Sequence, residues 1–165
     1  MKQIITLLLL GCSMLGGFAQ EDNSWQTRPE NVIYGNLLGD VSLISINYER
    51  DFFSHEHYFL AAKLGLGYNE EFCIIFCEDQ LRTYTTVPIA LTGNIGGGRN
   101  YFEFGLGYSW ISGIDDMVYP VLGYRLHSKK PGRAVFKVYS NGWPLGGVSD
   151  YIVFSPIGLG LGVAF

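Results

Sequence analysis

Large apolar residues alternate with small or polar residues along most of the chain. The clearest example is segment 101–110, where every second residue is large and apolar. The apolar parity is Phe102, Phe104, Leu106, Tyr108 and Trp110, and the other parity is Tyr101, Glu103, Gly105, Gly107 and Ser109. Segment 58–68 repeats the pattern. Because successive side chains of a strand point to opposite faces, both segments are predicted to be β-strands with one apolar face.

The same alternation predicts eight strands in all. They cover residues 31–38, 42–50, 58–68, 82–92, 101–110, 118–126, 133–140 and 152–165. The first strand alternates poorly and is placed before a turn at Gly39 and Asp40. Pro88 weakens the prediction of the fourth strand slightly, because proline cannot donate a hydrogen bond to a neighbouring strand. Tilted strands of about 9–11 residues are long enough to cross a bilayer. We therefore expect an all-β fold, an eight-stranded antiparallel up-and-down transmembrane β-barrel with its apolar parity outward.

The expected connections differ in length on the two sides of this barrel. Segments 53–57, 96–100 and 127–132 are compact, and 69–81 is the longest of the others. Outer-membrane barrels have short periplasmic turns and longer outer loops, which orients the chain. Aromatic residues should then mark the two membrane boundaries. The outer set is Tyr68, Tyr84, Tyr108, Trp110, Trp143 and Tyr151, and the periplasmic set is Phe52, Tyr58, Phe102, Tyr124 and Phe165.

The first twenty residues have the features of an export signal. Lys2 precedes an apolar run at 4–10, and small residues flank Phe18 at Gly17 and Ala19. The chain is therefore predicted to contain a signal peptide at 1–19, a periplasmic linker at 20–30 and a barrel domain at 31–165. Cleavage for lipidation at Cys12 is the less favoured alternative, because the small-residue site would then have no role.

Composition narrows the class of protein. The 165 residues suit one domain, and 48% hydrophobic against 16% charged residues excludes a disordered chain. A net charge of −4 argues against nucleic acid as a partner. After the leader no run approaches the 18 apolar residues of a membrane-spanning helix, so the exported chain is soluble or a barrel. Its two cysteines, Cys73 and Cys77, are expected to form a disulfide rather than a redox or metal site.

The carboxy terminus carries the most specific resemblance. Gly160, Val163 and Phe165 match an assembly signal of a glycine followed by spaced hydrophobic or aromatic residues, although Gly158 stands where a polar residue is usual. Over residues 31–165 the chain resembles the small eight-stranded outer-membrane β-barrel proteins of Gram-negative bacteria. The resemblance implies a location in the cell outer membrane, contact with outer-membrane lipid, and the barrel assembly machinery as a partner.

Charged residues fall on the parity that should face the lumen. They are Glu49, Lys63, Glu103, Arg125 and Lys137. An eight-stranded barrel is only wide enough to be filled by side chains, so we expect no open pore. Buried charges must be paired or hydrated. An internal salt-bridge network is favoured over a proton or ion path.

An enzymatic role is not expected. Barrels that modify lipid A need a His with a Ser and a carboxylate near the outer leaflet. The three histidines, His55, His57 and His127, fall in turns on the opposite side, where His127 and Ser128 are expected to be solvated. Their spacing is a weak metal signal. We predict no catalytic residue, cofactor or metal.

The expected function is a structural or surface-interaction role. Loop 69–81 is apolar at Phe72, Ile74, Ile75 and Phe76, so it either covers the barrel mouth or contacts a surface partner. One alternative is a soluble, lipocalin-like barrel that carries an apolar ligand, although a lipocalin would place its apolar parity inside. A lipid-modifying outer-membrane enzyme is the other.

Overall fold

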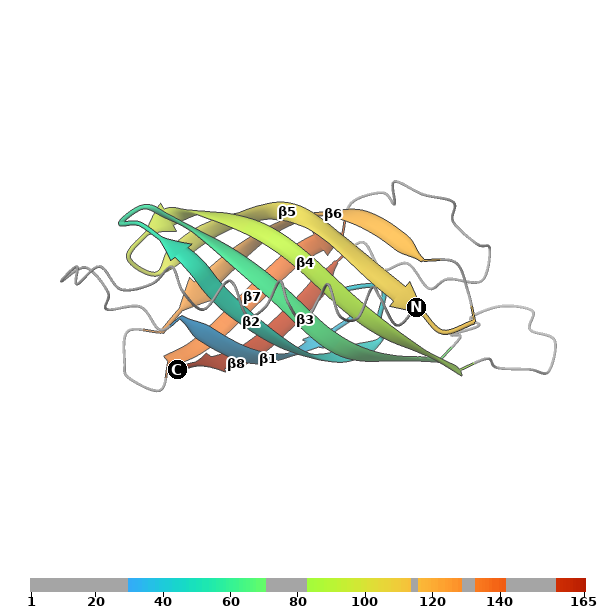
Figure 1. Ribbon diagram of the computed structural model, residues 1–165. Coiled ribbons are helices and arrows are strands. Elements are labelled where there is room, and N and C mark those ends of the chain that lie inside the picture. The colour runs from blue at the N-terminus through green and yellow to red at the C-terminus, as the bar shows by residue number, and fades with distance from the viewer. Residues whose placement is uncertain (1–29, 71–82, 114–115, 129–132, 142–156) are drawn as a thin grey trace.

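Eight antiparallel strands close into a single barrel (Figure 1). The computed structural model describes residues 30–70, 83–113, 116–128, 133–141 and 157–165. The strands are β1 (Asn31–Leu37), β2 (Ile44–Ser54), β3 (Tyr58–Glu70), β4 (Thr83–Gly97), β5 (Asn100–Ile111), β6 (Met117–His127), β7 (Arg133–Asn141) and β8 (Gly158–Ala164). Each strand pairs with the next in sequence, and β8 pairs with β1 from Val32↔Ala164 to Leu37↔Leu159. The predicted all-β, eight-stranded antiparallel barrel is confirmed.

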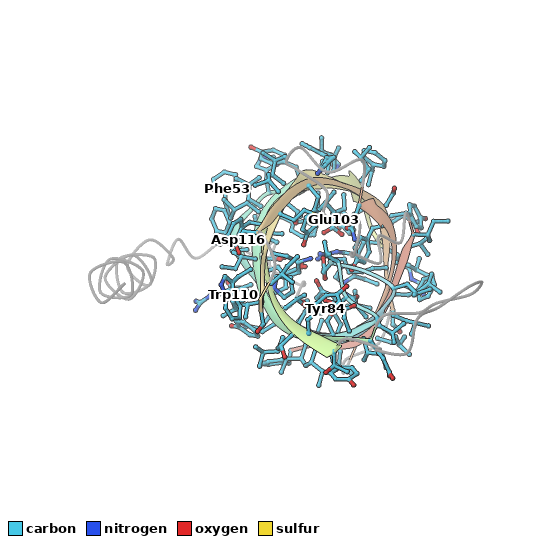
Figure 2. All side chains as sticks on the ribbon, turned by 90° about the vertical axis from the view of Figure 1, so that its right-hand side faces the viewer. Phe53, Tyr84, Glu103, Trp110 and Asp116 are labelled. Carbon is cyan, nitrogen blue, oxygen red and sulfur yellow. The ribbon has the colours of Figure 1, made fainter. Side chains whose placement is uncertain are left out.

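Two hairpins and the carboxy terminus lie at one end of the barrel, on the left in Figure 1. We call it the short-turn end, and the opposite end, from which Figure 2 is viewed, the loop end. The β4–β5 hairpin turns at Gly98, whose φ of 64° is readily adopted only by glycine. A register shift between Asp51 and Phe53 disrupts the β2–β3 ladder near its hairpin.

The two faces of the barrel wall differ sharply in polarity. Ile46, Leu66 and Leu161 on the outer face are each about two-thirds exposed, at 68%, 66% and 67%. Side chains of the other parity fill the interior. Asn47 is one of them and has 0% exposure. Figure 2 shows Phe53 and Trp110 outside the wall and Glu103 and Tyr84 inside it. The barrel is therefore apolar outside and largely polar inside.

Inward glycines make room for the large lumen side chains. A Cβ at Gly123 would lie 2.5 Å from the Cβ of Tyr139, and one at Gly107 would overlap the ring of Tyr119. Each glycine thus supports an aromatic ring that crosses the lumen. This explains why glycine occupies these two inward positions.

Two side chains predicted to lie outside the lumen are inside it. His127 is not in a solvated turn: β6 extends to this residue, which is only 5% exposed and meets the ring of Tyr101 edge-on. Tyr84 is not on the outer aromatic boundary but inside the barrel, at 5% exposure. His127 points inward because β6 runs one residue further than expected. Tyr84 points inward because it has the opposite parity to outward-facing Ile89 on the same strand.

Candidate functional site in the barrel lumen

Four charged side chains from four strands meet in the middle of the lumen. We call Glu49 on β2, Glu103 on β5, Arg125 on β6 and Lys137 on β7 the charge network. The Lys137 ammonium lies 2.9 Å from both Glu49 Oε2 and Glu103 Oε1. The Arg125 guanidinium donates to Glu49 Oε1, and its Nη2 lies 3.6 Å from Glu103 Oε2. Two acids and two bases thus balance each other across the barrel.

Aromatic rings flank the two cations of the charge network. The Lys137 ammonium lies 4.7 Å from the ring centre of Tyr34, and the Arg125 guanidinium lies 5.2 Å from that of Phe59. Arg125 and Lys137 are direct register partners on β6 and β7. Two like charges tolerate this proximity because both carboxylates reach them from elsewhere on the wall, and the ring faces add cation–π attraction.

A second polar cluster surrounds Asp40, towards the loop end. Its carboxylate accepts four hydrogen bonds: from Asn36 Nδ2 at 2.6 Å, from Tyr139 Oη at 3.0 Å, from Tyr119 Oη at 3.3 Å and from the Lys63 ammonium. Asp40 has 0% exposure. We call these five residues the Asp40 site.

Asp40 reaches the lumen because the connection between β1 and β2, residues 38–43, folds into the barrel. Leu38, Asp40 and Val41 all have φ near 60°, the left-handed region that non-glycine residues rarely adopt. The side chain of Asn69 bonds both Val41 O, at 2.9 Å, and Leu43 N, at 2.7 Å. The lumen contacts hold the turn in this unusual conformation.

The turn also closes an apolar cluster. Val41 is 2% exposed and packs among residues of four strands. The cluster consists of Val41, Tyr84, Ile111, Met117, Tyr119, Val121 and Tyr139. The described part of the lumen is therefore occupied by side chains from the charge network through the Asp40 site to this cluster.

The structure places all five charged residues expected in the lumen inside the barrel. Glu49, Glu103, Arg125 and Lys137 come together, whereas Lys63 joins the separate Asp40 site. Asp40 itself was missed, because a lone Asp beside Gly39 is as typical of an ordinary exposed turn. The tyrosines at 119 and 139 lie on the expected inward parity, but their part in binding Asp40 was not foreseen.

Other candidate residues lie away from the lumen clusters or outside the described residues. Gly160 faces inward, where a Cβ would lie 2.7 Å from Asn36 Oδ1, and Val163 and Phe165 face outward. Cys73 and Cys77 lie outside the described residues, as does most of loop 69–81. The first two residues of that predicted loop, Asn69 and Glu70, belong instead to β3.

The described part of the chain contains neither a metal-binding group of side chains nor a membrane-spanning helix. No group of three or more His, Cys, Asp or Glu side chains in these residues is arranged to hold a metal ion. No helix within the same residues is long and apolar enough to span a membrane.

Comparison with known proteins gives no match. No family model matches the chain, and neither a curated protein nor a solved structure is significantly similar to it. The interpretation of the lumen therefore depends on its own chemistry. That chemistry can hold the walls together by ion pairs and can bind a carboxylate.

Proposed function

We propose that the protein is an integral outer-membrane β-barrel with a closed lumen and a structural or surface-interaction role. The observation that carries the proposal is the inverted polarity of the wall. Isoleucine, leucine and phenylalanine side chains cover the outer face of all eight strands, whereas ion pairs occupy the inside. Contiguous apolar surface beyond a few hundred Å² is rare on soluble monomers and typical of membrane contact.

Aromatic residues near the ends of the outer face support the same proposal. At the short-turn end the hydroxyl groups of Tyr48 and Tyr124 donate to Asn31 and Asn100, at 2.6 and 2.7 Å. Trp110 lies on the outer face near the other end of β5 and is 47% exposed. Exposed amphipathic rings at both ends of an apolar belt suit the two interfaces of a bilayer.

The contents of the lumen favour a role without transport or catalysis. Arg125, Glu49 and Tyr119 have exposures of 0%, 1% and 0%, so side chains occupy the cross-section that a pore would need. A carrier of an apolar ligand needs an apolar interior cavity. The ion pairs and the bound Asp40 carboxylate disfavour that lipocalin-like alternative.

The sequence supplies the remaining parts of the proposal. Residues 1–19 would direct export, and Gly160, Val163 and Phe165 on and beside β8 would be recognised by the barrel assembly machinery. The specific work of the protein would then lie at the loop end, where residues of loop 69–81 contact a surface partner.

Cell fractionation combined with gel mobility tests the proposal. The protein should be recovered in the outer membrane. Its gel band should migrate differently before and after the sample is boiled in detergent, because a closed barrel stays folded in detergent until it is heated. Recovery in the soluble periplasm would overturn the membrane assignment and favour the soluble carrier. A membrane location with steady ionic conductance in planar bilayers would overturn the closed lumen instead.

A further inference from the structure

Asp40 is bound by the barrel in the way that a protein binds a small carboxylate ligand. Each carboxylate oxygen receives two donors: Oδ1 from Lys63 and Tyr119, and Oδ2 from Asn36 and Tyr139. The donors come from β1, β3, β6 and β7, so they surround the group across the barrel. One ammonium, two hydroxyls and one amide form a complete anion-binding shell.

The donors are held in place by contacts that do not involve the Asp40 side chain. Asn36 Nδ2 also donates to Tyr139 Oη, at 2.5 Å, and Tyr119 Oη lies 3.4 Å from Ser109 Oγ. The ring of Tyr139 lies 5.6 Å from the Lys63 ammonium. Removal of the Asp40 carboxylate should therefore leave the binding shell assembled.

The carboxylate is delivered by a turn and not by the barrel wall. Residues 38–43 are linked by Leu38 N to Leu43 O and Ser42 N to Gly39 O, both at 2.9 Å, and three of the six residues have left-handed φ. This conformation persists because the lumen contacts over-determine it. The turn is thus an occupant of the loop-end lumen as well as a connection between strands.

We propose that the loop-end lumen is a binding site for a small carboxylate, formed by Asn36, Lys63, Tyr119 and Tyr139, which Asp40 occupies in the resting protein. A ligand that presents a carboxylate from the loop end competes with Asp40 for the same four donors. A tethered group has a high effective concentration, so the resting site is filled internally. This inference goes beyond the proposed role and does not depend on the membrane assignment.

Chemical rescue of the variant Asp40→Gly tests the proposal. Glycine suits the φ of 59° at this position, so the substitution removes the carboxylate without adding backbone strain. The measurement is the temperature at which half of the purified, detergent-solubilised protein loses its folded gel band. We expect the variant to have a lower midpoint than the wild-type protein. Sodium formate should raise that midpoint. The midpoint should continue to rise as the formate concentration exceeds the dissociation constant, because a ligand that binds only the folded state stabilises it further at each higher concentration.

Three controls make this result specific. Sodium chloride at equal ionic strength should not restore the midpoint, and formate should not raise the midpoint of the wild-type protein, whose site is occupied. The double variant Asp40→Gly/Lys63→Met retains the space but lacks the ammonium, so formate should have no effect on it. Equal effects of formate and chloride, or an equal response of the double variant, would overturn the proposal.

A failure of Asp40→Gly to fold is itself informative. The yield of folded protein after dilution from urea then becomes the measurement, with Asp40→Ser as a second small replacement. Formate, but not chloride, should increase that yield. An unchanged yield for both variants would overturn the proposed site. Recovery of the wild-type protein in the periplasm would overturn only the membrane assignment, so the two failures are distinguishable.

Discussion

Glu49 and Lys63 are register partners on β2 and β3, yet they make ion pairs in different clusters. The Glu49 carboxylate binds Arg125 and Lys137 on the far wall, whereas the Lys63 ammonium binds Asp40. Long side chains lean along the strand direction and across a narrow lumen, so Cα register does not decide which charges meet. The lumen is consequently divided into two separate ionic clusters.

Loss of the Lys63 ammonium should destabilise the barrel strongly. Lys63→Met leaves the Asp40 carboxylate buried without its only cationic partner in the Asp40 site, and broken buried pairs cost about 3–5 kcal/mol. The free energy of unfolding, measured by urea titration in detergent micelles, should fall by that amount. The double variant Lys63→Met/Asp40→Asn removes both charges and should recover part of the loss. A double variant no more stable than Lys63→Met would contradict this explanation.

The two acids of the charge network should differ in importance. Glu49 has close partners in both Arg125 and Lys137, while Glu103 has one at 2.9 Å and another only at 3.6 Å. Hydrogen bonds to charged groups contribute about 1.5–3 kcal/mol. Glu49→Gln should therefore reduce the free energy of unfolding by more than Glu103→Gln, the matched control. Equal losses of unfolding free energy would mean that these differences in distance do not affect how much each carboxylate contributes.

Inward and outward glycines should respond differently to an added methyl group. At Gly123 a Cβ would meet Tyr139 at 2.5 Å, whereas at outward Gly35 the nearest atom is 3.9 Å away. Overpacking costs about 1–3 kcal/mol, so Gly123→Ala should lower the unfolding midpoint in urea. Gly35→Ala should leave that midpoint almost unchanged. If both variants unfold alike, the lumen packing described above is incorrect.

An arginine on the outer face should reveal the medium that surrounds the barrel. Leu66 is 66% exposed, so Leu66→Arg in water would alter stability by no more than about 0.5 kcal/mol. Near the middle of a bilayer the same change costs about 2–4 kcal/mol. Unfolding in lipid vesicles should show the larger loss. Glu56→Arg, at the exposed β2–β3 turn, is the control and should have little effect in either medium.

Hydrophobic alternation was sufficient to predict the eight strands and the face on which most of their residues lie, although Tyr84 was assigned to the wrong face. The same alternation predicts the inward position of Tyr84, because Tyr84 has the opposite parity to the outward-facing Ile89 on the same strand. Alternation is a local property, however, and cannot show which lumen charges meet. That depends on strand tilt and on side-chain reach across the barrel. The inward turn was beyond prediction because non-glycine residues with left-handed φ leave no simple sequence signal.

The binding of Asp40 also constrains the order in which the barrel can fold. Its partners Tyr119 and Tyr139 are 79 and 99 residues further along the chain. Contacts between such distant residues form slowly, because closing so long a loop costs conformational entropy before the contacts are gained. The turn between the first two strands therefore cannot reach its final state until the sixth and seventh strands are in place. The final conformation of this one turn thus reports that β6 and β7 have joined the barrel.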